Sequence, residues 1–267
     1  MAVVVAMFPV VGSAAEPLVF ADGRIRCIVE TEPKGREPDA DFLRMLSLSM
    51  KVALQILPPP QEPATLSIRL LAPPGLYQRT LALFKSPPAA MQYEDTIEVR
   101  PEGDIVKMAF RLGHEISHWL AARAAPVRPP LWLDEGLAQR MASRAAAAAA
   151  RTERRALSRL TPEAIADHAM TLDELTSLDV YRDSPEVAAA FYWQAEELVG
   201  TLLDRLGKED FLRYLATLST PDAPNWQTPL REWWYFNDAD FEALERRVMR
   251  PPAPPAVPAA APSLEVP

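Results

Sequence analysis

The chain has 267 residues, 49% of them hydrophobic and 24% charged, with a formal net charge of -8. A chain of this length and composition can bury a substantial core, which excludes a wholly disordered protein. The acidic balance argues against nucleic acid as the main partner, because binding to phosphates requires clustered Lys and Arg. The single cysteine, Cys27, excludes an intrachain disulfide, and we expect its thiol to be buried in a strand.

Residues 1–15 have the features of a signal peptide. An apolar run covers Ala2–Val11, and the small residues at 13–15 suit cleavage before Glu16. No Lys or Arg precedes the run, and it is shorter than the roughly 20 apolar residues that span a bilayer. We therefore expect an exported chain, periplasmic or secreted, without stable membrane insertion. The alternative is a buried strand that includes residues 3–5.

Residues 16–103 are predicted to form a small lobe of mixed α and β structure. Alternation of apolar and polar side chains predicts strands, and apolar residues three or four apart predict helices. Prolines at the ends of these patterns mark where elements stop. The expected elements are strands at 24–30, 65–71 and 96–100 and helices at 39–57 and 75–84.

Residues 104–250 are predicted to form a mainly helical lobe, so that the fold class is α+β. Asp104 is a suitable N-cap for the first helix, Ser184 followed by proline begins a later one, and Gly207 ends it. The Pro- and Ala-rich residues 251–267 are expected to form a disordered tail. The expected helices follow an apolar stripe at 105–119, run from near Leu131 through the alanine tract at 145–150, and cover 184–207, 208–218 and 238–249.

The strongest helical pattern contains an H-E-x-x-H motif formed by His114, Glu115 and His118. Residues four apart lie one turn apart on the same helix face, so the two imidazoles can bind one zinc ion through ring nitrogens. Glu115 lies about 100° further round the helix, where it can reach a zinc-bound water as a general base. The chain has only three histidines, which makes a chance placement of two of them around a Glu the weaker alternative.

A catalytic zinc site also needs a third protein ligand and an open position. The next predicted helix offers two adjacent carboxylates, Asp134 and Glu135, which face different sides of that helix. A carboxylate near an exposed helix start is the structural alternative for either residue. Gly136 follows them and permits a close approach between helices.

The H-E-x-x-H motif followed by a W-L-x-E-G-x-A helix, here residues 132–138, resembles the gluzincin branch of zinc metallopeptidases, which includes aminopeptidase N and thermolysin. The resemblance is specific over 112–138 and extends weakly to about 206, with a slightly shorter linker between the two motifs than in aminopeptidase N. It implies a zincin-like metallopeptidase domain over 16–250 that acts on a peptide or protein substrate. The implied zinc ligands are His114, His118 and Glu135.

The same resemblance implies a residue that stabilises the oxyanion. Gluzincins of the aminopeptidase N type use a tyrosine from a later helix, and Tyr192 is similar to it in position. A core aromatic is the alternative interpretation of Tyr192, and Tyr181 is a less favoured candidate. His168 is a candidate for substrate binding, although a surface helix position is the simpler interpretation.

The sequence thus predicts a zinc-dependent hydrolase, most simply a peptidase, with Glu115 and Tyr192 as catalytic residues. A non-catalytic zinc-binding module and a helical interaction domain with an accidental motif are the alternatives. An endopeptidase is favoured over a free aminopeptidase, because the chain has no segment like the G-x-M-E-N of aminopeptidase N. The strand at 96–100 is expected to be an edge strand that binds extended peptide by strand addition. The substitution Ile97→Pro is therefore expected to weaken peptide turnover.

Overall fold

The computed structural model describes residues 16–31, 37–71, 90–101, 103–125, 127–153, 166–180 and 184–249. The predicted signal peptide at 1–15, the predicted helix at 75–84 and the predicted tail at 251–267 lie outside these described residues.

One sheet of five strands carries the β structure, in the order β1-β2-β3-β5-β4. The central strands β2, β3 and β5 are parallel, and β1 and β4 pair antiparallel at the two edges. Three strands confirm the strands predicted from the sequence to within one residue, whereas β1 and β4 were not predicted. The strands are β1 (Leu18–Phe20), β2 (Ile25–Thr31), β3 (Ala64–Leu70), β4 (Ala90–Tyr93) and β5 (Thr96–Val99).

The expected role of the strand at 96–100 as an edge strand is wrong. Ile97 in β5 pairs with Ile68 on one side and with Gln92 on the other. A peptide cannot add to a strand whose two neighbours are already in place, and Ile97→Pro would disturb the sheet itself. The edge strand is β4, whose four residues are too few to show a clear alternation in the sequence.

The described residues also form seven α-helices, five of which begin within one residue of a predicted start. Asp104 accepts hydrogen bonds from the backbone N–H groups of Val106 and Lys107, which confirms it as an N-cap. Gly207 interrupts α7 with a φ of 75°, where the sequence predicted a helix end. The helices are α1 (Ala40–Leu54), α3 (Ile105–Ala124), α4 (Leu131–Glu153), α6 (Leu172–Thr176), α7 (Pro185–Leu218), α8 (Gln227–Trp234) and α9 (Asp238–Met249).

Two details of the helices differ from the sequence prediction. The helix α1 ends at Leu54, three residues before the predicted end at residue 57, and its last turn loosens before Pro58. The helices α6 and α8 were not predicted, because each is too short for a periodic apolar pattern to stand out.

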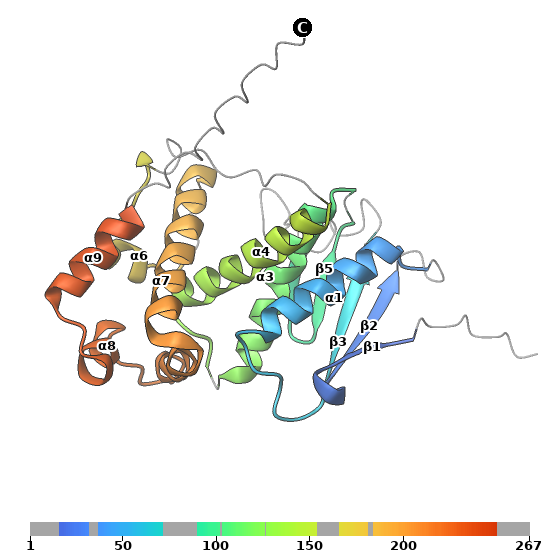
Figure 1. Ribbon diagram of the computed structural model, residues 1–267, viewed down its shortest axis with the longest axis horizontal. Coiled ribbons are helices and arrows are strands. Elements are labelled where there is room, and N and C mark those ends of the chain that lie inside the picture. The colour runs from blue at the N-terminus through green and yellow to red at the C-terminus, as the bar shows by residue number, and fades with distance from the viewer. Residues whose placement is uncertain are drawn as a thin grey trace, which may run out of the picture.

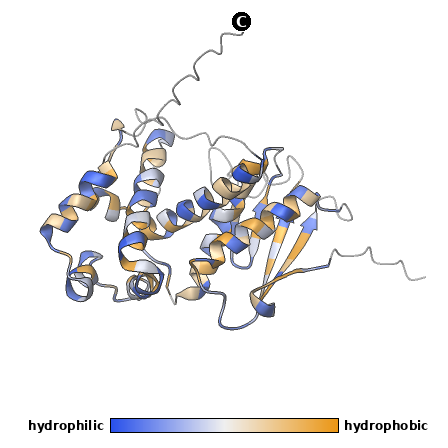
Figure 2. Ribbon diagram, in the orientation of Figure 1, coloured by the Kyte–Doolittle hydropathy of each residue, from blue (hydrophilic) through white to orange (hydrophobic). Residues whose placement is uncertain are grey.

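One continuous hydrophobic core joins the sheet and the helices, so the described residues before and after 104 share it. Cys27, Leu66, Ile68 and Ile97 project from the same face of the sheet and are fully buried, which confirms the buried thiol. Figure 1 shows the sheet at one end of the molecule, α7, α8 and α9 at the other, and α3 and α4 between them. In Figure 2 the strands are largely orange, while the helices carry both orange and blue residues.

The fold is therefore a mixture of α and β structure, as the α+β prediction requires. In the described part of the chain, no helix has both the length and the hydrophobicity that a membrane crossing requires. The helix pair α3 and α4 packs closely at the centre of the molecule, and the predicted metal ligands lie on it.

Candidate metal centre

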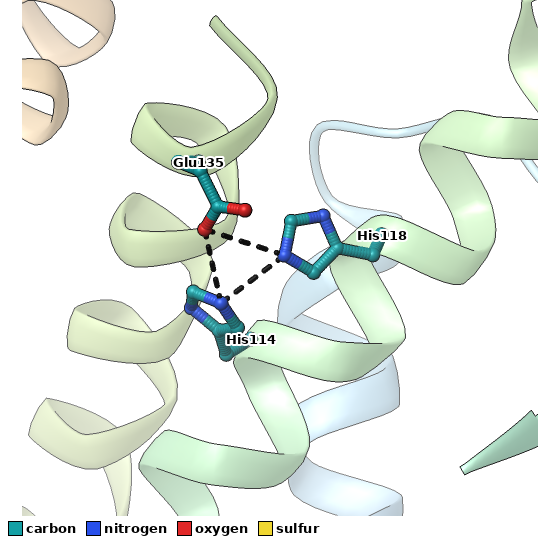
Figure 3. A group of neighbouring side chains, drawn as sticks. All are labelled: His114, His118 and Glu135. Carbon is teal, nitrogen blue, oxygen red and sulfur yellow. Dashed lines mark hydrogen bonds and ion pairs between the residues drawn. The ribbon is translucent and has the colours of Figure 1, made fainter. Parts of the chain in front are cut away.

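Three side chains from two helices converge where α3 and α4 face each other. His114 and His118 project from α3, and Glu135 projects from the first turns of α4 (Figure 3). The Nε2 atoms of the two histidines lie 3.1 Å apart. Oε2 of Glu135 lies 3.3 Å from Nε2 of His114 and 3.5 Å from Nε2 of His118. The three ligand atoms thus form a nearly equilateral triangle.

This triangle has the dimensions that a tetrahedral metal site requires. Two ligand atoms about 2.0–2.1 Å from a tetrahedral zinc ion are about 3.3 Å apart, which is the average edge of the triangle. His114, His118 and Glu135 form the one such group among the described residues that could hold a metal ion. The donor set, two imidazoles and one carboxylate, is also one that binds catalytic zinc.

Two glycines allow close helix crossings at the site, Gly113 between α3 and α4 and Gly136 between α4 and α7. A Cβ on Gly113, just before His114, would lie 3.0 Å from Cβ of Ala145 on α4. A Cβ on Gly136, just after Glu135, would lie 2.7 Å from Cγ2 of Val199 on α7. Both distances are shorter than ordinary contacts between carbon atoms, so a larger residue would push the helices apart.

Glu135 is the most buried of the three candidate ligands, with a side chain only 2% exposed. Burial raises the pKa of its carboxyl group, but the hydrogen bonds to His114 and then to His118 outweigh burial and keep that pKa well below its ordinary value. Glu135 therefore carries its negative charge at neutral pH, which is the state that binds a cation.

Asp134, the competing candidate for third ligand, lies on the outer side of the triangle. Its Oδ1 atom is 3.1 Å from Nδ1 of His118, the ring nitrogen that faces away from the other ligands. Its Oδ2 atom accepts a 2.6 Å hydrogen bond from Nε of Arg128. Burial lowers the pKa of His118, yet the hydrogen bonds to Asp134 and Glu135 outweigh it and raise that pKa to about 10.

Glu115 lies outside the ligand triangle, as its place on the helix predicted. Its Oε2 atom accepts a 2.8 Å hydrogen bond from the backbone N–H of Gln92 in the edge strand β4. The motif helix and the edge strand are therefore joined directly beside the candidate metal site.

Tyr192 reaches the site from α7. The centroid of its ring lies 6.3 Å from that of His114. Burial, followed by the nearby carboxylates of Glu135 and Glu115, raises the pKa of its hydroxyl group above the ordinary value. Tyr192 therefore keeps its proton at neutral pH and can donate a hydrogen bond in the site.

The remaining candidates do not join this group. His168 lies in the turn after residue 166, half-buried and apart from the ligand triangle. Tyr181 lies outside the described residues. Sequence reasoning missed Arg128 and Gln92, because an arginine among prolines and a glutamine in a short strand carry no motif.

Comparisons with known proteins do not place the chain in a family. No family model matches the chain, and a search of curated proteins gave no significant match. The functional assignment therefore depends on the chemistry of the site.

Proposed function

We propose that the chain is a zinc-dependent peptidase of the gluzincin type. The observation that carries this proposal is the triangle of His114 Nε2, His118 Nε2 and Glu135 Oε2, with edges of 3.1, 3.3 and 3.5 Å. Its edges suit a tetrahedral zinc ion, and its donors match the two histidines and one glutamate of known catalytic zinc sites. The side chains of His114 and His118 are 17% and 10% exposed, so both rings are partly accessible to water.

The residues around the triangle supply the other groups that hydrolysis needs. A bound zinc ion supplies Lewis-acid chemistry, polarising a water molecule and the scissile carbonyl group. Glu115 would accept a proton from the attacking water on its carboxylate and pass it to the leaving amine. Tyr192, which holds its proton at neutral pH, donates a hydrogen bond to the oxyanion.

A peptide is the substrate that the edge strand favours. The N–H of Gln92 points toward Glu115 and away from β5, so the outer edge of β4 faces the candidate site. An extended peptide added to this edge would run beside the ligand triangle and would pair through the outward carbonyl of Gln92, because the N–H of Gln92 is already bonded to Glu115. We thus infer strand addition at β4 and not at the strand at 96–100.

The first experiment measures zinc and turnover in the same preparations. Elemental analysis of metal-stripped and reloaded protein should find about one zinc ion per chain, and Glu135→Ala should lower zinc affinity 10-fold or more. Digestion of a peptide library should be lost in Glu115→Gln while its zinc content stays at the wild-type level. Glu209→Gln, at an exposed position of α7, is the matched control for a lost carboxylate.

The outcomes separate the proposal from its two alternatives. Stoichiometric zinc without any turnover, unchanged by Glu115→Gln, would indicate a non-catalytic zinc-binding module. Absence of stoichiometric zinc from the wild-type protein would indicate an accidental motif and overturn the proposal.

A further inference from the structure

Asp134 is a buried carboxylate that the proposed hydrolysis does not use. Its side chain is 4% exposed, yet it touches two partners at once, His118 through Oδ1 and Arg128 through Oδ2. A buried carboxylate is costly unless its charge and hydrogen-bonding atoms are matched, and these two contacts provide the match.

We propose that Asp134 and Arg128 form a positioning pair that holds His118 with Nε2 directed at the metal. This inference rests on the metal site proposed above. A neutral imidazole has one protonated and one free nitrogen, so donation of the Nδ1 proton to Asp134 leaves the lone pair on Nε2. Nε2 is the atom of His118 that lies 3.1 Å and 3.5 Å from the other two ligand atoms.

Arg128 anchors Asp134 from the loop before α4. Its Nε atom bonds Asp134 at 2.6 Å, and one of its Nη atoms lies 3.7 Å from Oε1 of Glu135. One guanidinium therefore faces two adjacent buried carboxylates, of which one binds the metal and the other orients a metal ligand. With its side chain 62% exposed, Arg128 keeps part of its own hydration while its positive charge offsets the buried carboxylates.

His114 lacks an equivalent support among the described residues. Its Nδ1 atom is buried there without a hydrogen-bond partner. The two histidine ligands are thus held differently, and removal of Asp134 should disturb His118 alone.

The decisive experiment measures zinc affinity by competition with a chromophoric chelator. Asp134→Ala should weaken zinc binding about 10- to 100-fold, the usual effect of losing a group that orients a metal ligand. Asp134→Asn should weaken it less, because the amide oxygen still accepts from Nδ1–H although the ion pair with Arg128 is lost. Arg128→Gln should weaken zinc binding in the wild-type protein and much less in the Asp134→Ala background, since Arg128 acts mainly through Asp134.

A matched control and a spectroscopic readout exclude a general loss of stability. Asp240→Ala removes another Arg–Asp pair, a 2.7 Å contact with Arg205 far along the chain, and should leave zinc affinity unchanged. Because the chain has three histidines, an NMR spectrum of nitrogen-labelled protein resolves the Nδ1 proton of His118. That proton signal should persist in Asp240→Ala and disappear in Asp134→Ala.

The results distinguish failure of this inference from failure of the proposed function. A wild-type protein that binds no stoichiometric zinc overturns the metal site itself. If the wild-type protein binds zinc, and the zinc affinities of Asp134→Ala and Asp134→Asn lie within twofold of the wild-type affinity, only the positioning pair is overturned. A loss of zinc affinity in Asp240→Ala equal to that in Asp134→Ala would also overturn the positioning pair. If Asp134→Ala fails to fold, the zinc affinities of Asp134→Asn and Arg128→Gln decide.

Discussion

The backbone N–H of Gln92 donates a 2.8 Å hydrogen bond to Oε2 of Glu115, linking the edge strand β4 to the motif helix α3. In an antiparallel pair, successive residues direct their N–H groups alternately toward the partner strand and away from it. Gln92 therefore points its N–H toward the site, while Met91 points its own toward β5. The edge strand thus holds the proposed general base by a main-chain contact.

Gln92→Pro should lower kcat on the order of 10-fold while zinc content stays at the wild-type level. Proline removes the N–H that holds Glu115, and at this edge position it costs no hydrogen bond of the sheet. Steady-state kinetics on a peptide selected from the library, together with elemental analysis, measures both quantities.

Two variants control for the other effects of that substitution. Gln92→Ala removes the side-chain hydrogen bond from Nε2 to the carbonyl of Glu94 and keeps the N–H, so its kcat should resemble that of the wild type. Met91→Pro removes an N–H that faces β5 and should destabilise the fold. A kcat for Gln92→Pro equal to that of Gln92→Ala would show that the contact with Glu115 is not used in turnover.

Tyr192→Phe should lower kcat about 10²- to 10³-fold, the range measured for loss of one oxyanion donor, with zinc affinity unchanged. The raised pKa of Tyr192 keeps its proton in place as pH rises through neutrality, so this hydroxyl should not cause a loss of activity below its ordinary pKa. Tyr214→Phe is the control, because the buried Tyr214 hydroxyl donates to the carbonyl of Trp226 and not to the site. Equal kcat values in the two variants would remove Tyr192 from the mechanism.

Gly136→Ala should destabilise the protein by about 1–3 kcal/mol, the usual cost of overpacking. The added methyl group would meet the carbonyl of Ala195 and the side chain of Val199, which forces α7 away from α4. Urea denaturation of the metal-free protein measures this free energy of unfolding. Gly103→Ala is the matched control, since its Cβ would meet nothing within 4 Å, and equal stability of both variants would contradict the close crossing.

Zinc binding should release about one proton from His118 at pH 8. The pKa of this ring is raised from 6.5 to about 10, so at pH 8 it holds protons on both nitrogens until the metal takes Nε2. Fewer protons should be released as the pH rises past 10. Fewer should also be released by Asp134→Asn, because this variant loses part of the charge that raises the pKa of His118. Calorimetry at pH 8 in buffers of different ionisation enthalpy counts these protons, and a binding enthalpy independent of the buffer would refute the prediction.

Local sequence rules predicted the parts of the site that lie within one helix. The four-residue spacing of His114 and His118 places them on one face of α3 whatever surrounds it, and Asp104 begins that helix by a hydrogen bond to its own first turn. The strands rich in β-branched residues could be predicted for the same reason, because their pattern is contained in seven residues or fewer.

The contacts between elements follow from the packing of the whole fold. Asp134 and Glu135 are neighbours in the sequence, and the crossing of α3 and α4 assigns Glu135 to the ligand triangle and Asp134 to the far side of His118. The sheet order likewise makes β4, and not the strand at 96–100, the edge beside Glu115. The amino-acid order is enough to tell which side chains share a helix face, because a helix repeats its geometry locally. Only packing between distant segments decided which faces meet, since that depends on helix spacing and strand order across the whole core.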